Sequence, residues 1–445
     1  MSASSSGRPT FDDPQLQHQI MRLRKVDRFT NLLCLAREYS CLAAIIGGSI
    51  LFAEFRSGWG VPWFWNFPVF LVAITLIGAL QHRLAGLGHE ASHYTFMKHR
   101  FLNDFIPDLF CMFPILTTVH FYRVFHMAHH QYTNDPERDP DLLNLAHGKR
   151  TFEFPMTRVR FIVLVYFCMF TAPIRFLRFQ LAYIAVNALG KGRSIYSGTE
   201  KGGRFGELYL PRLGTVLGLA YLIVLGAAVR YLAGTGRAGW IIPAGLIGMI
   251  LAGFTTYALP DWAVFSSPFR QAYSCRFAGV ARLCYFSVVL MALAELRLIT
   301  AGHSTFYPLI LWFVPLVSSF PFFMLLRDVY QHSNADSGRL TNSRVFFTDP
   351  FTRWAVFVYG QDMHIPHHLF PAIPHYRLGE LHKILKQASA DYGTQVVECH
   401  GTFSDPLGRA TILDEMTRPH PAANRRQDIQ SHELSSCEAA AYRSL

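Results

Sequence analysis

Six long apolar segments constrain this chain more than any other feature of its sequence. A helix needs about 20 mostly apolar residues to cross the hydrocarbon core of a bilayer. Hydrophobic residues make up 51% of the 445 residues and charged residues only 16%, whereas a soluble domain of this length needs more charge to cover its surface. We therefore predict an all-α polytopic membrane helical bundle of about six spans, namely Tyr39–Phe55, Pro62–Leu80, Gly214–Leu232, Trp240–Leu259, Leu283–Leu298 and Pro308–Leu326.

Eight of the 20 histidines fall into three short clusters beside these segments. The first cluster has the spacing HxxxH, and the other two share the spacing HxxHH, two copies of which are rare by chance. Side chains three or four residues apart share one face of an α-helix, so the imidazoles of each cluster should converge. Imidazole suits iron, copper, nickel and zinc, and eight ligands exceed the needs of one tetrahedral ion. We predict a site for two metal ions, held by His89, His93, His126, His129, His130, His364, His367 and His368.

A ninth histidine follows the last apolar segment. His332 lies four residues after Asp328, so both side chains should enter the same aqueous mouth as the clusters if the helix continues. We predict that His332 is a further metal ligand. Asp328 either contacts the metal, directly or through water, or orients a histidine; an ordinary polar partner at the membrane surface is the alternative.

Two of the clusters depart from a simple helical stripe. Gly86 and Gly88 weaken the helix that leads into the first cluster, so a kink or a break is expected as one outcome. Pro366 interrupts the third cluster and disfavours the α conformation at the residue before it. We therefore predict that His364 lies at or before the start of a short helix, with the other two histidines of that cluster in its first turn.

Four more polar residues lie near the predicted ligands. Asp135, Asp139 and Asp141 follow the second cluster in a proline-containing acidic loop and are candidates to accept hydrogen bonds from ligand imidazoles. A turn without any metal role is an equally good interpretation of this loop. His82 lies seven residues before His89, roughly on the same helix face, and we expect it behind the ligands rather than among them.

The order of spans and clusters limits the topology. The first two clusters follow the second span and the third cluster follows the sixth, so they meet on one side only if an even number of crossings separates them. Four spans lie between them, and the apolar but interrupted segment Phe161–Val186 should therefore not cross. Lys and Arg gather in the loops on the histidine side, which marks the cytoplasmic face. We predict a multi-pass integral membrane protein in which a cytoplasmic helical cap holds both metals and both termini are cytoplasmic.

We divide the chain into three regions. Residues 1–38 form a cytoplasmic segment without the apolar core of a signal peptide, and Pro14–Glu38 alternates apolar and basic residues as an amphipathic helix on the membrane surface would; a plain solvated helix is the alternative. Residues 39–400 form the membrane catalytic domain. Residues 401–445 form a polar tail, which we expect to be partly disordered because it lacks apolar periodicity after about Pro419.

In order and spacing, the three clusters resemble those of the membrane fatty acid desaturase superfamily. The second half of the chain is similar to bacterial acyl desaturases in the runs Leu326-Arg-Asp-Val-Tyr-Gln-His332 and His364-Ile-Pro-His-His-Leu-Phe-Pro-Ala-Ile-Pro-His-Tyr376. The resemblance implies a nonhaem di-iron centre that uses dioxygen to introduce a double bond into the acyl chain of a lipid or thioester. It assigns the nine histidines named above as iron ligands. Many relatives have Asn or Glu where this chain has Asp328.

The resemblance leaves several functions open. Lipid hydroxylases and sphingolipid or carotenoid oxidases share the same histidine clusters. Relatives with a fused haem domain carry a His-Pro-Gly-Gly motif that this sequence lacks, so we expect a separate electron donor, either a ferredoxin or cytochrome b5 with its reductase. A histidine-rich metal transporter is a remote alternative, because the clusters lie outside the spans rather than at mid-membrane. The net charge of +11 comes without a nucleic-acid-binding motif, and we expect no nucleic-acid partner.

Overall fold

The computed structural model describes residues 11–145, 152–190, 192–196 and 212–419. In this part of the chain, six helical segments are long and apolar enough to cross a membrane, so the predicted bundle of six spans is confirmed. The second and sixth segments continue beyond the apolar runs and carry His89 and His332 with them, because packing against other helices stabilises their polar ends. The segments are Thr30–Phe55, Trp63–Ser92, Leu213–Gly234, Ala238–Ala258, Cys275–Ile299 and His303–His332.

Helix α3 (Asn66–Ser92) is the centre of the fold, with α2 (Thr30–Phe55) and α14 (Ser319–His332) packed along it. It runs unbroken through both glycines that could have interrupted it. A Cβ at Gly86 would meet Val358 Cγ2 at 2.7 Å, and one at Gly88 would overlap Met112 Sδ. These glycines therefore make room for close neighbours, and the expected break does not occur.

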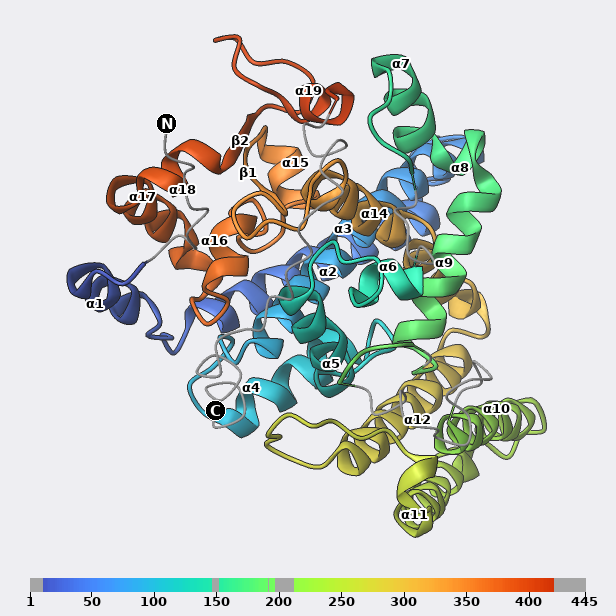
Figure 1. Cartoon of the computed structure of the whole chain (residues 1–445). Coiled ribbons are helices and arrows are strands. Elements are labelled where there is room, and N and C mark those ends of the chain that lie inside the picture. The colour runs from blue at the N-terminus through green and yellow to red at the C-terminus, as the bar shows by residue number, and fades with distance from the viewer. Residues whose placement is uncertain (1–10, 146–151, 191, 197–211, 420–445) are drawn as a thin grey trace, which may run out of the picture.

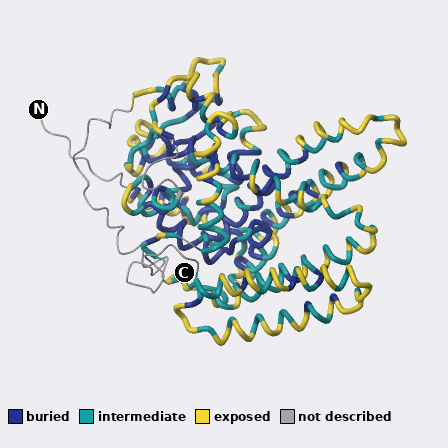
Figure 2. Tube along the Cα trace, turned by 90° about the vertical axis from the view of Figure 1, so that its right-hand side faces the viewer, coloured by how far each residue is buried: buried dark blue, intermediate teal, exposed yellow. Residues whose placement is uncertain are grey.

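Three further membrane-length helices form a group of their own: α10 (Leu213–Gly234), α11 (Ile241–Ala258) and α12 (Cys275–Ile299). They lie together at one side of the molecule, at the lower right of Figure 1. Only 17% of the most apolar window of each is buried inside the protein. Figure 2 shows the buried residues concentrated in one half of the molecule, from which helices with exposed surfaces project.

That buried half is built from short elements around the ends of α3 and α14. Its helices are α1 (Pro14–Leu23), α4 (Arg100–Pro107), α5 (Val119–Gln131), α6 (Pro140–Leu145), α15 (Pro350–Ala355), α16 (His364–Leu369), α17 (Leu378–Ala388), α18 (Ala390–Gln395) and α19 (Ile412–Thr417). Two short strands, β1 (Arg344–Phe347) and β2 (Val397–His400), pair in parallel with Arg344 opposite Val397. Neither strand was predicted from the sequence. Single-turn or π-helical pieces complete the structure: η1 (Trp63–Trp65), η2 (Asp108–Met112), η4 (Ala238–Trp240), η5 (Asp261–Ala263), η6 (His303–Thr305), η7 (Leu309–Phe313), α13 (Val314–Val317) and η8 (His375–Arg377).

The ambiguous segment between the second and third spans does not contain a membrane-length helix. It divides into α7 (Arg158–Phe161), η3 (Ile162–Tyr166), α8 (Cys168–Thr171) and α9 (Pro173–Asn187). The longest of these, α9, has 15 residues and is about 22 Å long at 1.5 Å per residue, which is less than the ~30 Å of a bilayer core. This agrees with the even number of crossings that the positions of the clusters required.

Both ends of the described chain pack onto the buried half. Helix α1 forms as an amphipathic helix, but its apolar residues Leu16, Ile20 and Leu23 are buried in a cluster with α17. The apolar face that was expected to lie on the membrane surface is therefore covered by α17, which contributes Leu381 and Leu385 to this cluster. At the other end, α19 is packed against α7, so the ordered region continues past residue 400 to Thr417. The tail expected after about Pro419 falls outside the described residues.

Candidate metal centre

The structure brings all nine predicted histidines together in two adjoining groups. One potential ligand atom from each member lies within 4.8 Å of those from the rest of its group. The first group draws on α3, α5 and α16, and the second draws on α5, α14 and α16. The first contains His89, His93, His126, His130 and His367, and the second contains His129, His332, His364 and His368.

The spacing of histidines on two short helices explains why the groups adjoin. Neighbouring residues on a helix point about 100° apart, so His129 and His130 of α5 face different groups. Thr118 caps the start of α5 by accepting a hydrogen bond from the Phe121 backbone N–H. On α16, His364 is the first helical residue, so its predicted place at the helix start is confirmed. The His130 and His368 rings, from different groups, stack with centroids 4.3 Å apart.

Nitrogen atoms within each group approach one another as ligands of a shared ion do. In the first group, His126 Nε2 lies 2.8 Å from His93 Nε2 and 3.0 Å from His130 Nε2. In the second, His364 Nε2 lies 3.0 Å from both His332 Nε2 and His368 Nε2. Two nitrogens at right angles, each about 2.1 Å from one ion, stand about 3.0 Å apart. The donor sets therefore fit one metal ion each.

Several of the histidine rings make a hydrogen bond through Nδ1, which leaves Nε2 as the nitrogen that can bind a metal. His129 Nδ1 lies 3.0 Å from Asp139 Oδ1, and His332 Nδ1 donates to the Asn342 carbonyl at 3.2 Å. The Thr133 hydroxyl donates to the backbone carbonyl of His129, so it accepts a hydrogen bond from His368 Nδ1 at 3.1 Å. Such partners fix the tautomer and the orientation of a ligand imidazole.

The electrostatic environment favours neutral imidazoles. Burial lowers the pKa of His126, His130 and His364 well below the usual value, and neighbouring histidines lower it further. The same two causes lower the pKa of His367 and His368. Metal ions bind the neutral form of histidine, so these side chains are in the form needed for ligation at neutral pH.

A buried cation fixes the end of α3 to α5. The Arg123 side chain is fully buried and donates from Nε to the Ser92 carbonyl at 3.0 Å and from an Nη to the Ala91 carbonyl at 2.8 Å. These carbonyls belong to the last turn of α3. Asp104 balances the charge at 2.6 Å. This network holds His93 opposite the histidines of α5.

The other predicted site residues take different positions. Asp139 lies directly behind His129, as described above, whereas Asp135 pairs with Arg138 and caps its own turn. The predicted contact of Asp135 with a ligand is therefore absent among the described residues, because its carboxylate is occupied by the local turn. His82 Nδ1 contacts the Ala355 carbonyl at 2.9 Å, and His82 belongs to neither group. Asp328 lines the pocket beside the second group rather than joining it.

Several contacts were missed because they come from distant segments. Gln361 Nε2 lies 3.2 Å from His89 Nε2, and the Asn342 carbonyl and the Thr133 hydroxyl carry no spacing signal. Asp141 of the acidic loop was a candidate from the sequence, and its Oδ2 lies 3.5 Å from His129 Nδ1. Glu90 Oε1 lies 3.5 Å from His89 Nδ1, although a helical wheel points Glu90 away from the ligand face.

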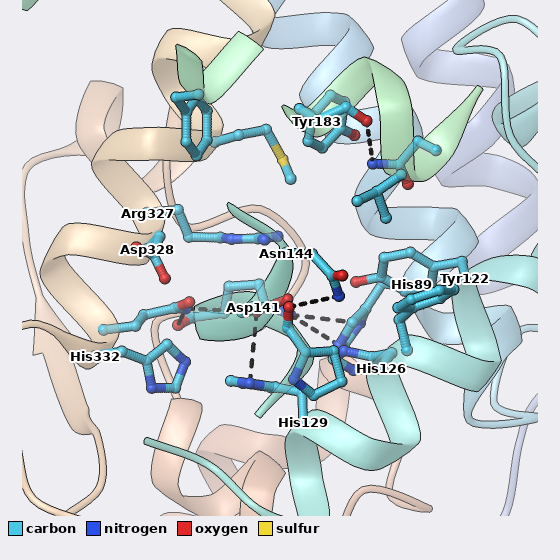
Figure 3. A pocket seen from close by; sticks show the side chains of 18 of the residues that line it. His89, Tyr122, His126, His129, Asp141, Asn144, Tyr183, Arg327, Asp328 and His332 are labelled. Carbon is cyan, nitrogen blue, oxygen red and sulfur yellow. Dashed lines mark hydrogen bonds and ion pairs between the residues drawn. The ribbon is translucent and has the colours of Figure 1, made fainter. Parts of the chain in front are cut away.

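One pocket opens onto both histidine groups. Histidines of the first and second groups form part of its wall, α9 contributes Phe179 and Tyr183, and α14 contributes Met324 and Arg327. Figure 3 shows Arg327 and Asp328 on one side of this pocket and His89, His126 and His129 on the other. The pocket combines apolar and polar walls beside the two candidate metal positions.

Comparisons with known proteins point to one family. The family model of fatty acid desaturases matches residues 62–276 and 259–399. The chain is 32% identical over 129 residues to dihydrorhizobitoxine desaturase of Bradyrhizobium elkanii, covering 29% of this chain and 33% of that protein. It is 29% identical over 117 residues to sn-1 oleoyl-lipid 12-desaturase of Picosynechococcus, covering 26% and 30%. It is 34% identical over 73 residues to sn-1 acyl-lipid omega-3 desaturase (ferredoxin) of Nostoc, covering 16% and 19%. Each match thus spans a third or less of the relative.

Proposed function

The chain belongs to the fatty acid desaturase family, and from this premise we propose that it is a membrane-bound, dioxygen-dependent oxidase that introduces a double bond into the acyl chain of a lipid or thioester. The observation that carries the proposal is the pair of histidine groups that open onto one pocket at the ends of membrane-length helices. An acyl chain can reach such a pocket from the bilayer without crossing water.

Two iron ions, one in each histidine group, would supply the activation of dioxygen and the removal of hydrogen from an unactivated methylene. The residues of the chain hold this centre. The nine imidazoles are the ligands, and the carboxylate of Asp139, the carbonyl of Asn342 and the hydroxyl of Thr133 keep three of them oriented. Asp328 and Asp141, at the pocket wall, are positioned to contact water or substrate beside the second group.

The balance of the reaction requires an external reductant. One dioxygen, two substrate hydrogens and two electrons with two protons from outside give one double bond and two waters. We propose a separate donor, either a ferredoxin or cytochrome b5 with its reductase; the printed name of the Nostoc relative includes ferredoxin. Basic loops on the histidine side favour an acidic donor through electrostatic steering. A turnover rate that does not change with salt concentration would show that electrostatic steering does not contribute.

The orientation in the membrane is also part of the proposal. The histidine-side loops carry most of the Lys and Arg residues, including Arg270 between the fourth and fifth spans, and Arg276 and Arg282 lie near the histidine-side end of the fifth span. The opposite loops carry Arg56 and Arg237. Loops rich in Lys and Arg face the cytoplasm. The cap that contains the histidines and the N-terminal and C-terminal segments would then be cytoplasmic.

A lipid hydroxylase, or a sphingolipid or carotenoid oxidase, is the alternative that the same centre supports. Lipid mass spectrometry of a host that expresses the chain separates these reactions. Desaturation removes two hydrogen atoms from the product, and hydroxylation adds one oxygen atom. We expect the loss of two hydrogens from an acyl chain, and no new product from the His367→Ala variant. A product with one added oxygen, or no change with the wild-type chain, would contradict the proposal.

A further inference from the structure

The pocket beside the histidine groups contains a cation that forms no ion pair within the described part of the chain. Arg327 lies on α14, five residues before His332. Its side chain is half-buried, and its Nε atom is buried without a hydrogen-bond partner. Asp141 and Asp328 line the same pocket, but neither forms an ion pair with this guanidinium among the described residues. A buried donor without a partner costs free energy, and a ligand that accepts a hydrogen bond from Arg327 would remove that cost.

The Arg327 side chain lies in the pocket. Figure 3 shows it extending from α14 into the pocket, whose wall also includes His89 and His126 of the first group. Tyr122 and Tyr183 line the same pocket.

Two phenol hydroxyls complete a polar wall. Among the described residues, neither the Tyr122 hydroxyl nor the Tyr183 hydroxyl has a hydrogen-bond partner, although both side chains line the pocket. A phenol is protonated at neutral pH, so both hydroxyls can donate a hydrogen bond.

A hydrocarbon chain has no hydrogen-bond acceptor for a guanidinium and two hydroxyl donors. An anionic oxygen group satisfies all three, because arginine binds carboxylates and phosphates through two parallel N–H donors. We propose that the substrate carries an anionic oxygen group, a carboxylate or a phosphate, which is bound inside this pocket by Arg327 with help from Tyr122 and Tyr183. The bond to be oxidised then lies near that group, and Arg327 selects substrates by their charged end. This inference rests on the proposed function in one respect, namely that the bound molecule is the substrate.

Binding to the metal-free, full-length protein in detergent micelles tests the inference without turnover. Calorimetric titration would compare octanoate, octyl phosphate and the neutral octanamide. We expect octanoate or octyl phosphate to bind at least about tenfold more tightly than octanamide, which is the scale of one hydrogen bond to a charged group. A preference for octanoate identifies a carboxylate, and a preference for octyl phosphate identifies a phosphate such as that of a lipid headgroup.

Variants assign the preference to a residue. Arg327→Gln should bind the anion and the amide equally, whereas Arg339→Gln should keep the wild-type preference, because Arg339 is exposed on the histidine side and is not part of the pocket wall. The wild-type comparison of acid with amide holds even if Arg327→Gln does not fold. Equal binding of all three probes by the wild type, or an unchanged preference in a folded Arg327→Gln, would overturn the inference. If the wild type makes a desaturated product but binds all three probes equally, only the anion site is contradicted. If it prefers an anion but makes no desaturated product, only the proposed reaction is contradicted.

Discussion

At the scale of single residues, the candidate metal centre consists of nine histidines and the groups that orient their rings. Spacing along one helix is a local signal, so HxxxH and HxxHH identified the eight cluster histidines, and the spacing from Asp328 identified His332. The contacts of the Asn342 carbonyl with His332 and of the Thr133 hydroxyl with His368 form only when the chain folds. Nothing in the local sequence of Asn342 and Thr133 distinguishes them from ordinary loop residues.

The carboxylate behind His129 gives the first prediction. Asp139 is fully buried and lies 3.0 Å from His129 Nδ1, so Asp139→Asn should weaken iron binding by roughly 10- to 100-fold, the usual effect of losing such a partner. Iron retained after dialysis against a graded chelator measures this change. Asp135→Asn is the matched control, since Asp135 pairs with Arg138 instead. Equal iron retention by both variants would show that Asp139 does not support the ligand.

The lowered histidine pKa values predict how the metal-free protein responds to acid. The folded state keeps His126, His130 and the histidines of α16 neutral, while the unfolded chain takes up protons near pH 6.5. The unfolded state therefore binds more protons below this pH, and the free energy of unfolding falls as pH decreases. Each group contributes at most about 1.4 kcal/mol per pH unit.

Thermal unfolding of the metal-free protein between pH 8 and pH 5.5 checks this expectation. The unfolding midpoint should be nearly constant above about pH 7 and should fall below about pH 6.5. The iron-loaded protein is the control, because bound metal competes with the protons and should move the fall to lower pH. A midpoint that stays level or rises on acidification would mean that the folded state carries these histidines protonated.

At the scale of elements, the membrane helices followed from apolar length alone, while their neighbours did not. Six apolar runs gave six helices, because a bilayer leaves the backbone few other choices. The packing of α1 against α17 and the short parallel pair β1–β2 depend on surfaces that only the folded chain creates. The continuity of α3 was also not predictable, since its glycines serve contacts with residues far along the chain.

The contact between α3 and α14 gives a prediction at this scale. A Cβ at Gly78 would meet Ser319 Cβ at 2.6 Å and the Phe320 backbone nitrogen at 2.7 Å. Gly78→Ala should therefore push the two helices apart and destabilise the protein by about 1–3 kcal/mol, with loss of iron because α14 carries His332. The unfolding midpoint and the iron content measure both effects. Gly47→Ala on α2 is the control, since a Cβ there meets nothing within 4 Å; an equal effect of the two substitutions would contradict this role for Gly78.

At the scale of the whole molecule, membrane topology and site assembly depend on each other. The clusters meet because an even number of spans separates them, and the segment that could have added a crossing divides into short helices. Counting spans was enough to predict this arrangement. The pocket wall contributed by α9 could not be predicted, because it depends on how that interrupted segment folds back over the site.

The proposed orientation gives the next prediction. Ser57, in the exposed loop between the first two spans, and Ser337, exposed on the histidine side, should lie on opposite faces of the membrane. In intact cells, a membrane-impermeant maleimide should label Ser57→Cys above the background of the unaltered chain. It should label Ser337→Cys only after the cells are permeabilised. The reverse pattern would place the histidines outside the cytoplasm.

The iron content of the purified, full-length chain tests the central claim most directly. Two histidine groups with four and five ligands should hold two iron ions per chain, measured by elemental analysis against protein concentration. His93→Ala in the first group and His364→Ala in the second should each lower that content. One ion per chain in the wild type, or two ions retained after both substitutions, would contradict a centre built from the two groups.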